Sequence, residues 1–207
     1  YQFEDWGRLK DEVESSIALK LAREILNPLT ALHFPIAFPE VFLGHSQGFN
    51  VILGNPPWEE AVLNEDKFWA RYEPGIIGLS QREQKEHMEN LRKSRPDLVT
   101  QLAKEIFETN IVRELLKAGN FPGMGTGDPD LYKAFAWRFL FATSPTYGRV
   151  GVVMPRTALS SLGSQEFRKE LFARANSLDV VTLQNTAKWV FDMEPRYSIG
   201  LLSISKS

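Results

Sequence analysis

Four short apolar segments, separated by stretches of helical character, constrain the fold of this chain more than any other feature. They occupy residues 49–54, 148–155, 178–183 and 197–205. The second segment, "GRVGVVMP", is a near-continuous apolar run of the kind found inside parallel sheets. Strands that alternate with helices along a chain favour an open α/β sheet. We therefore predict an α/β fold.

The stretches around these segments divide the chain. Residues 8–26 carry apolar residues near one helical face, and residues 33–42 contain two prolines, which predict an extended connector. Residues 59–119 are charged and helical in character. We expect residues 1–48 to form a helix and an extended connector leading into the sheet. Residues 49–207 would form the sheet domain, with 59–119 as a helical insertion.

Composition restricts the classes of function. The chain has 207 residues, a formal net charge of −2 and no cysteine. The missing cysteines exclude disulfides, thiolate metal sites and a cysteine nucleophile, and they fit a reducing cytoplasm. The near-neutral charge gives no electrostatic footprint of a nucleic-acid binder, and no apolar run approaches the ~20 residues of a membrane helix. Because the sequence begins with Tyr1, we expect it to be a piece of a longer polypeptide.

The turn that ends the first apolar segment carries the strongest chemical signal. Its sequence is "NPPW", residues 55–58. The two prolines donate no hydrogen bond and fix their own φ angles, so the turn is stiff. It presents two acceptors, the Asn55 side-chain oxygen and the Pro56 carbonyl, beside the flat surface of Trp58. Ligands of open α/β sheets bind beyond the carboxyl ends of the strands, which is where this turn is expected.

Such a turn suits a planar group that bears an exocyclic amine. An aryl amine is a poor nucleophile because its lone pair is delocalised into the ring. Two acceptors off the ring plane would draw the nitrogen toward tetrahedral geometry and free the lone pair for attack. This is catalysis by orientation and fixed dipoles, without a covalent intermediate or a metal. His33, His45 and His87 lack ligand spacing, so no metal site is predicted.

The turn and its flanks resemble a known family. "HFPIAFPEVF", "GFNVILGNPPWE", "GTGDPDLYKAF", "GRVGVVMPRTAL" and "LQNTAKWVFDMEPRYSIGLLSI" are similar, in this order, to large bacterial adenine-specific DNA methyltransferases. These are the type IIG restriction–modification enzymes and phage-defence methyltransferases of the BREX and DISARM kind. The resemblance covers nearly the whole chain from residue 33 onward. It implies a partial Rossmann-like fold of the S-adenosylmethionine-dependent methyltransferases, with a helical insertion.

The resemblance implies roles for residues around the proline turn. Asn55 and the carbonyl of Pro56 would accept hydrogen bonds from the N6 amine of the target adenine, with Pro57 completing the rigid turn. Trp58 would stack on the base after the base has flipped out of the duplex. Phe191 matches the aromatic residue that closes the other side of the base.

Other matched positions lie near the cofactor or the last strands. Asp128 and Tyr132 match a loop–helix segment near the cofactor pocket, and Asp130 stands where the family usually has asparagine. Asn185 and Tyr197 match recurrent positions near the last strands, without an assigned role.

The family's main cofactor loop has no counterpart here, because nothing before residue 33 resembles a strand, a glycine-rich turn and a helix. The chain therefore resembles the carboxyl-side half of the catalytic domain. Its expected partners are the missing amino-terminal cofactor-binding half, the missing target-recognition domain and, through the parent protein, double-stranded DNA. The expected location is the bacterial cytoplasm, with no membrane association. The fragment by itself is expected to be inactive.

Three alternatives remain open from the sequence. The substrate amine could instead belong to cytosine N4, an RNA base or a protein glutamine, whereas the absence of cysteine excludes cytosine-C5 methylation. The chain could be a non-catalytic module that binds DNA or a partner. The "NPP" turn could also be a plain strand end.

Overall fold

The computed structural model describes residues 15–26, 32–125, 129–192 and 198–206. The chain divides into two compact units, residues 1–45 and residues 46–207.

The first unit contains helices only, within its described residues. These are α2 (Ile17–Leu26), α3 (Phe34–Ala37) and α4 (Pro39–Phe42). The prediction of an extended connector over 33–42 is wrong, because most of this stretch forms two single-turn helices. Each of the two has a proline within its first two positions. Proline is tolerated in the first turn of a helix because the N–H that it lacks has no partner there.

The second unit is a mixed α/β structure built on one four-stranded sheet. Its strands are β1 (Val51–Gly54), β2 (Arg149–Pro155), β3 (Ser177–Gln184) and β4 (Ser198–Ser205). Their order in the sheet is β1-β2-β4-β3. β1 pairs with β2 in parallel, and β4 runs antiparallel to both of its neighbours. The α/β prediction and the four predicted strands are confirmed, and the sheet is mixed.

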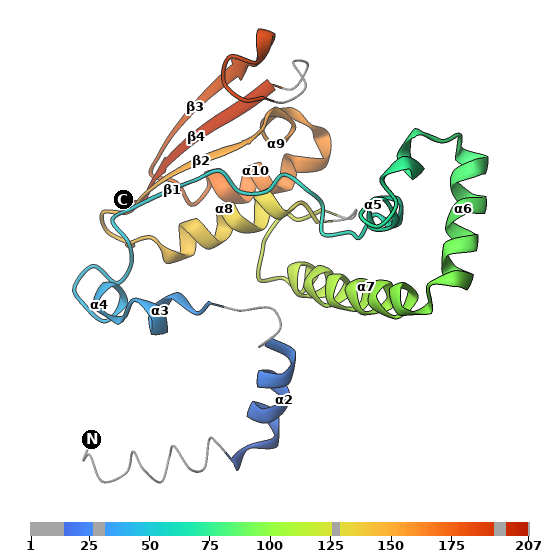
Figure 1. Cartoon of the computed structure of the whole chain (residues 1–207). Helices are drawn as coiled ribbons and strands as arrows, with labels where there is room; N and C mark the ends of the chain where they lie inside the picture. Colours follow the sequence, from blue (N-terminus) through green and yellow to red (C-terminus); the bar gives the residue numbers. More distant parts are fainter. Residues whose placement is uncertain (1–14, 27–31, 126–128, 193–197, 207) are drawn as a thin grey trace. The chain divides into compact units, whose positions relative to one another are not determined.

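Helices cover one face of this sheet. α8 (Leu131–Ala142) and α10 (Gln165–Phe172) run beneath the strands, and the short α9 (Arg156–Ser160) follows β2 (Figure 1). Apolar side chains of the helices and strands form the main core between them. The fully buried members with large side chains are Trp137, Leu140, Val150, Met154, Phe167, Leu171, Leu202 and Ile204.

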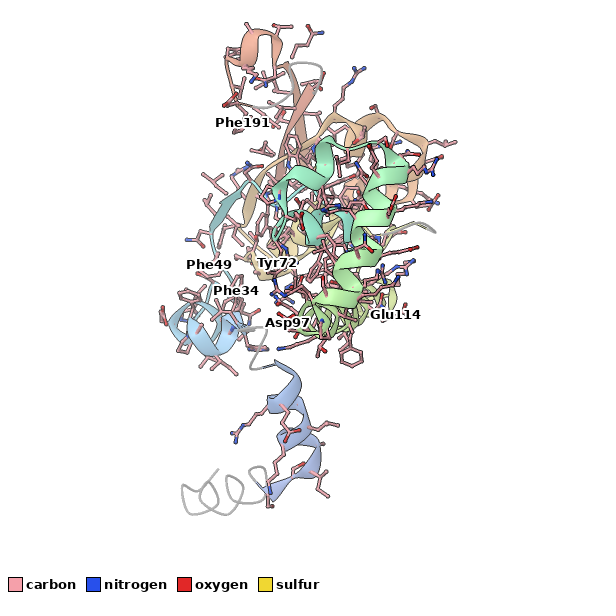
Figure 2. The ribbon with its side chains drawn as sticks, turned by 45° about the vertical axis from the view of Figure 1, so that its right-hand side comes forward. Phe34, Phe49, Tyr72, Asp97, Glu114 and Phe191 are labelled. Atoms are coloured by element: carbon pink, nitrogen blue, oxygen red, sulfur yellow. The ribbon has the colours of Figure 1, made fainter. Side chains whose placement is uncertain are left out.

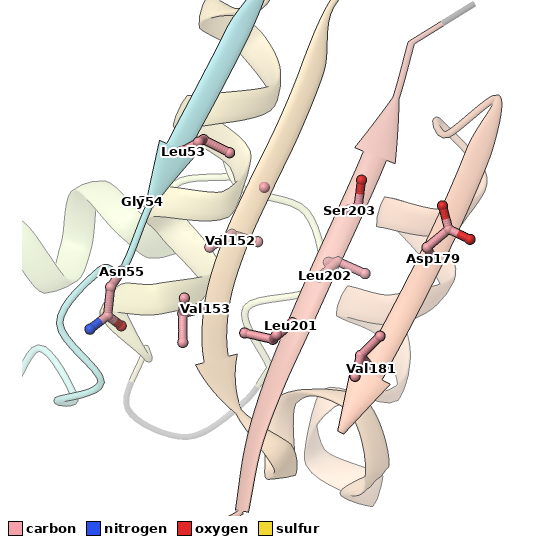
Figure 3. Close-up of a pocket in the computed structure, with 11 residues that line it drawn as sticks. Leu53, Gly54, Asn55, Val152, Val153, Asp179, Val181, Leu201, Leu202 and Ser203 are labelled. Carbon is pink, nitrogen blue, oxygen red and sulfur yellow. The ribbon is translucent and has the colours of Figure 1, made fainter. Parts of the chain in front are cut away.

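The opposite face of the sheet is hollowed and apolar. Figure 3 shows side chains from all four strands lining a cavity of about 570 Å³. Leu53 on β1 is 78% exposed there, and Val181 on β3 is also exposed. Asn55 stands at the β1 end of the same cavity.

The predicted insertion is helical and has its own small core. It contains α5 (Glu65–Ala70), the 3-10 helix η2 (Pro74–Gly78), α6 (Gln81–Ser94) and α7 (Pro96–Lys117). α6 begins with a capping box, in which Ser80 and Glu83 satisfy each other's backbone N–H groups. The buried residues of this core are Phe68, Trp69, Ile76, Leu98 and Leu102.

Candidate substrate site at the end of β1

The proline turn starts from a tightly held strand end. A Cβ atom added to Gly54 would lie 2.7 Å from ring atoms of Phe139 on α8. Glycine is therefore needed for β1 to approach this ring so closely. Gly54 also pairs in register with Val152 of β2. The position of Asn55, the next residue, is fixed by both contacts.

The far end of the turn is anchored to the segment that precedes α8. The backbone N–H of Leu131 donates to the carbonyl of Glu59 at 2.9 Å, and that of Ala61 donates to the carbonyl of Pro129 at 2.8 Å. Glu60 and Asp130 form an antiparallel bridge between these two bonds. Residues 55–58 thus span two fixed points, which adds to the stiffness of the prolines.

The two predicted acceptors of the turn are available. Asn55 is exposed and Pro56 is buried. Within the described part of the chain, neither the Asn55 side chain nor the Pro56 carbonyl takes part in a hydrogen bond. Pro56 also lines a cavity, so its carbonyl is a good place for a donor group of a ligand to bind.

A cavity of about 250 Å³ brings together residues from distant parts of the sequence, namely Asn55, Pro56, Trp58 and Phe191. Phe191 lies on the turn that follows β3, which Figure 2 shows at one end of the sheet. Drug-sized ligands occupy pockets of about 300 Å³ or more, so this cavity has the size for a smaller group. It combines two acceptors with two aromatic side chains, an arrangement suited to a flat ring that carries an amine.

Trp58 contributes an unusual polar atom. Its Nε1 is buried and has no hydrogen-bond partner among the described residues. A second, more polar depression of about 630 Å³ lies against Trp58, lined also by the insertion residues Lys67, Phe68 and Arg71. Trp58 therefore borders both hollows.

Tyr132, predicted to lie near the cofactor, is a core residue of α8. It is 3% exposed, and its hydroxyl donates to Asp130 Oδ2 at 3.1 Å. Burial, followed by the neighbouring charge of Asp130, raises the pKa of this hydroxyl well above its ordinary value. Tyr132 presents no surface to a ligand, and Asp128 lies outside the described residues. A role of these two residues in binding S-adenosylmethionine stays a prediction from the resemblance.

Asp130 gains a clear structural role that sequence reasoning did not assign. Its carboxylate pairs at 2.7 Å with the ammonium of Lys133, which is 4% exposed. A buried lysine without a partner is strongly unfavourable, so this pair fixes the start of α8. The same segment holds the far end of the proline turn through the bridge at Glu60. The signal was the i, i+3 spacing of Asp130 and Lys133, which favours pairing in a helix.

Of the two other positions matched by the resemblance, Asn185 and Tyr197, the structure describes only Asn185. Asn185 is fully buried beside the turn that carries Phe191, and Tyr197 lies outside the described residues. The basic residues of the insertion are partly neutralised, since Arg92 pairs with Glu65 and Arg95 pairs with Asp97.

Searches of the described residues found no group of three or more His, Asp or Glu side chains arranged to hold a metal ion. Among the same residues, no helix has both the length and the apolar character that crossing a bilayer requires. Comparison with protein-family models, with curated proteins and with solved structures gave no match to this chain.

Proposed function

We propose that this chain is the carboxyl-side part of a methyltransferase that modifies the N6 amine of adenine in DNA. The enzyme would use S-adenosylmethionine and belong to a larger restriction–modification or phage-defence protein. One observation carries the proposal: Asn55, Pro56 and Trp58 line one small cavity together with Phe191, which lies far from them in the sequence. Asn55 follows the carboxyl end of β1, the end of a strand at which α/β proteins place their ligands.

The acceptors of the turn would hold the amine. One N–H of the adenine amine would donate to Asn55 Oδ1 and the other to the Pro56 carbonyl. Both acceptors lack partners within the described residues and stand on a turn fixed at both ends. The turn would therefore need little reorganisation when the amine binds, which is the condition for catalysis by fixed dipoles.

The aromatic residues favour a ring over a flexible substrate. Trp58 and Phe191 both border the cavity, and aromatic side chains stack well on a planar base. A glutamine side chain would gain less from two rings, so a nucleobase is the better candidate. A base in a duplex would have to leave the stack to reach this cavity. Cytosine N4 and an RNA base remain alternatives with the same chemistry.

The sheet supports a position for the rest of the enzyme. Among the described residues β1 is an edge strand, and the apolar cavity beside it opens on the face opposite α8 and α10. An amino-terminal half could extend the sheet beyond β1 and complete a Rossmann-like domain. That half would hold S-adenosylmethionine, which supplies the methyl group when it is bound.

Methyl transfer tests this proposal. The full-length polypeptide that carries this chain is incubated with tritiated S-adenosylmethionine and, separately, with adenine-containing duplex DNA, duplex DNA whose only methylatable amines are on cytosine, RNA, or protein. We expect label in the adenine-containing duplex. Asn55→Ala should lower kcat by about 100-fold or more, since it removes a fixed dipole at the reacting amine.

Asn50→Ala is the matched control, because Asn50 is also exposed and stands at the other end of β1. It should leave kcat unchanged. Label found only in RNA or protein, or an unchanged rate in Asn55→Ala, would contradict the proposal.

A further inference from the structure

The turn that carries Phe191 has a strained backbone. After β3 it passes through the 3-10 helix η4 (Thr186–Lys188). Ala187 and Lys188 have φ angles of 58° and 57°. Residues other than glycine adopt this left-handed region rarely, and such strain persists only where the surroundings enforce it.

The side chain of Asn185 holds this turn in place through hydrogen bonds on its inner side. Its side-chain Nδ2 donates to the Phe191 carbonyl at 2.8 Å. Its Oδ1 accepts from the backbone N–H of Val190 at 3.1 Å and from that of Phe191 at 3.2 Å. Because Asn185 is fully buried, these three bonds are shielded from competing water. They hold both backbone polar groups of Phe191.

Two further contacts close the rim of the turn. Trp189 Nε1 donates to the Gln184 carbonyl at 2.8 Å, and Lys188 pairs with Asp192 at 2.7 Å. Both are exposed, and exposed ion pairs contribute little. The buried side chain of Asn185 is therefore the main restraint on where Phe191 stands.

We propose that Asn185 is a positioning residue for the base site, acting through Phe191. This inference rests on the proposed function, because the object held by Phe191 and Trp58 is taken to be a nucleobase. Asn185 fixes the backbone of Phe191 before the ligand arrives, so the ring does not have to be ordered during binding. If the Asn185 side chain were removed, the Phe191 backbone would no longer be held in place. Ligand binding would then weaken although no group that touches the ligand had changed.

Two measurements on the chain separate positioning from the proposed function. The first is hydrogen exchange of the Val190 and Phe191 amides, which needs no ligand. In Asn185→Ala these amides should exchange at least about tenfold faster, because their acceptor is gone. The second is the Kd for adenosine, followed by NMR, which should rise by about tenfold.

A double-mutant cycle identifies the route of the effect. In a Phe191→Ala background, Asn185→Ala should cause no further loss of adenosine affinity, because the two changes act through one ring. Gln184→Ala is the control: its side chain is exposed and its carbonyl, which Trp189 uses, is retained. It should change neither exchange nor affinity.

Asn185→Asp keeps the inference testable if the alanine variant does not fold. This change retains the Oδ1 acceptor for both backbone N–H groups but places a carboxylate oxygen, in place of the Nδ2 donor, against the Phe191 carbonyl. Affinity should be low at pH 7 and should recover at acidic pH, where a protonated carboxyl can donate again.

Each outcome has a defined meaning. Slow exchange retained in Asn185→Ala overturns the positioning role. Equal affinity losses with and without Phe191 overturn it as well, since Asn185 would then act by another route. Faster exchange with unchanged adenosine affinity shows that Asn185 positions Phe191 but that Phe191 does not serve a base site, which contradicts the proposed function.

Discussion

The two faces of the sheet have similar apolar strands but opposite surroundings. On the face that α8 and α10 cover, Val152, Met154, Leu202 and Ile204 are buried to 3% exposure or less. On the opposite face, Leu53 and Val181 are exposed around the large cavity of Figure 3. Strands that are apolar on both faces are typical of sheets covered on both sides.

The two faces therefore have different expected roles, one in the stability of this unit and the other in its assembly with further parts of the protein. The covered face holds this unit of the chain together. The open face contributes little to that stability, and under the proposed function its apolar patch would be the surface that the amino-terminal half covers. The candidate substrate site lies at the end of β1, and Asn55 lines both this site and the cavity on the open face. The following predictions test the comparison, from the largest effect to the smallest.

Neighbouring leucines on β4 give the most direct contrast between the faces. Both border the open cavity, but the Leu202 side chain is 2% exposed and belongs to the main core, whereas Leu201 is only half-buried. Leu202→Ala should lower the free energy of unfolding by 2–5 kcal/mol, roughly, because it leaves a cavity in the core. Leu201→Ala should cost about 1 kcal/mol or less. Urea unfolding of both variants checks this, and equal losses would break the comparison.

Two glycines, Gly54 and Gly151, allow the packing of the two faces to be compared at the backbone. Gly54→Ala should destabilise the chain by about 1–3 kcal/mol, since the new methyl group would press on the Phe139 ring. In Gly151→Ala the new methyl would meet only the Leu53 side chain, 2.6 Å away, which is exposed and able to move. That variant should lose less than Gly54→Ala in thermal unfolding. The reverse order would show that the open face is the more tightly packed one.

The sequence predicted those features that depend on local patterns. Apolar periodicity identified the four strands, and the two prolines identified the rigid turn at 55–58. The prediction for 33–42 failed because a proline in the first turn of a helix has the same sequence signature as a proline that breaks one. The site was predicted only in part. Phe191 came from the family resemblance, because no local pattern brings it to residues 55–58.

The restraints behind the site were beyond sequence reasoning. Asn185 bonds to backbone groups five and six residues later, and any asparagine near a turn has the same appearance in sequence. Its role depends on burial, which a single sequence does not specify. The pairing of Asp130 with Lys133 was equally hard to predict, because its importance comes from the burial of the lysine.

A charge on the open face should separate folding from assembly. Leu53→Lys should change the free energy of unfolding of this chain by roughly 0.5 kcal/mol or less, because the side chain is exposed. The same change should lower methyl transfer by the full-length polypeptide, since it would bury a charge beneath the proposed amino-terminal half. Unfolding and tritium transfer measured together check this. Unchanged transfer would indicate that the open face stays uncovered.

The smallest expected effect on stability comes from the capping box of α6. It lies in the helical insertion, away from both faces of the sheet, and so serves as a reference. Hydrogen bonds from the Ser80 side chain and backbone lower the pKa of Glu83 below its ordinary value of 4.5. Since the folded-state pKa is depressed, the carboxylate stabilises the fold above pH 4.5, and this stabilisation is lost as the pH falls through the folded-state value. The difference in Tm between wild type and Glu83→Ala should therefore shrink below this pH. A difference that stays constant with pH would exclude the charge as its cause.

Recognition of an amine by the turn at 55–58 is the central claim, and a pair of ligands tests it directly. Adenosine offers two N–H groups to Asn55 and Pro56, whereas N6,N6-dimethyladenosine offers none and keeps the same ring for Trp58 and Phe191. NMR titration of the chain should give a Kd for adenosine that is at least about tenfold lower than for the dimethyl compound. Asn55→Ala should remove most of that difference. Equal affinities for the two ligands in the wild-type chain would contradict the account.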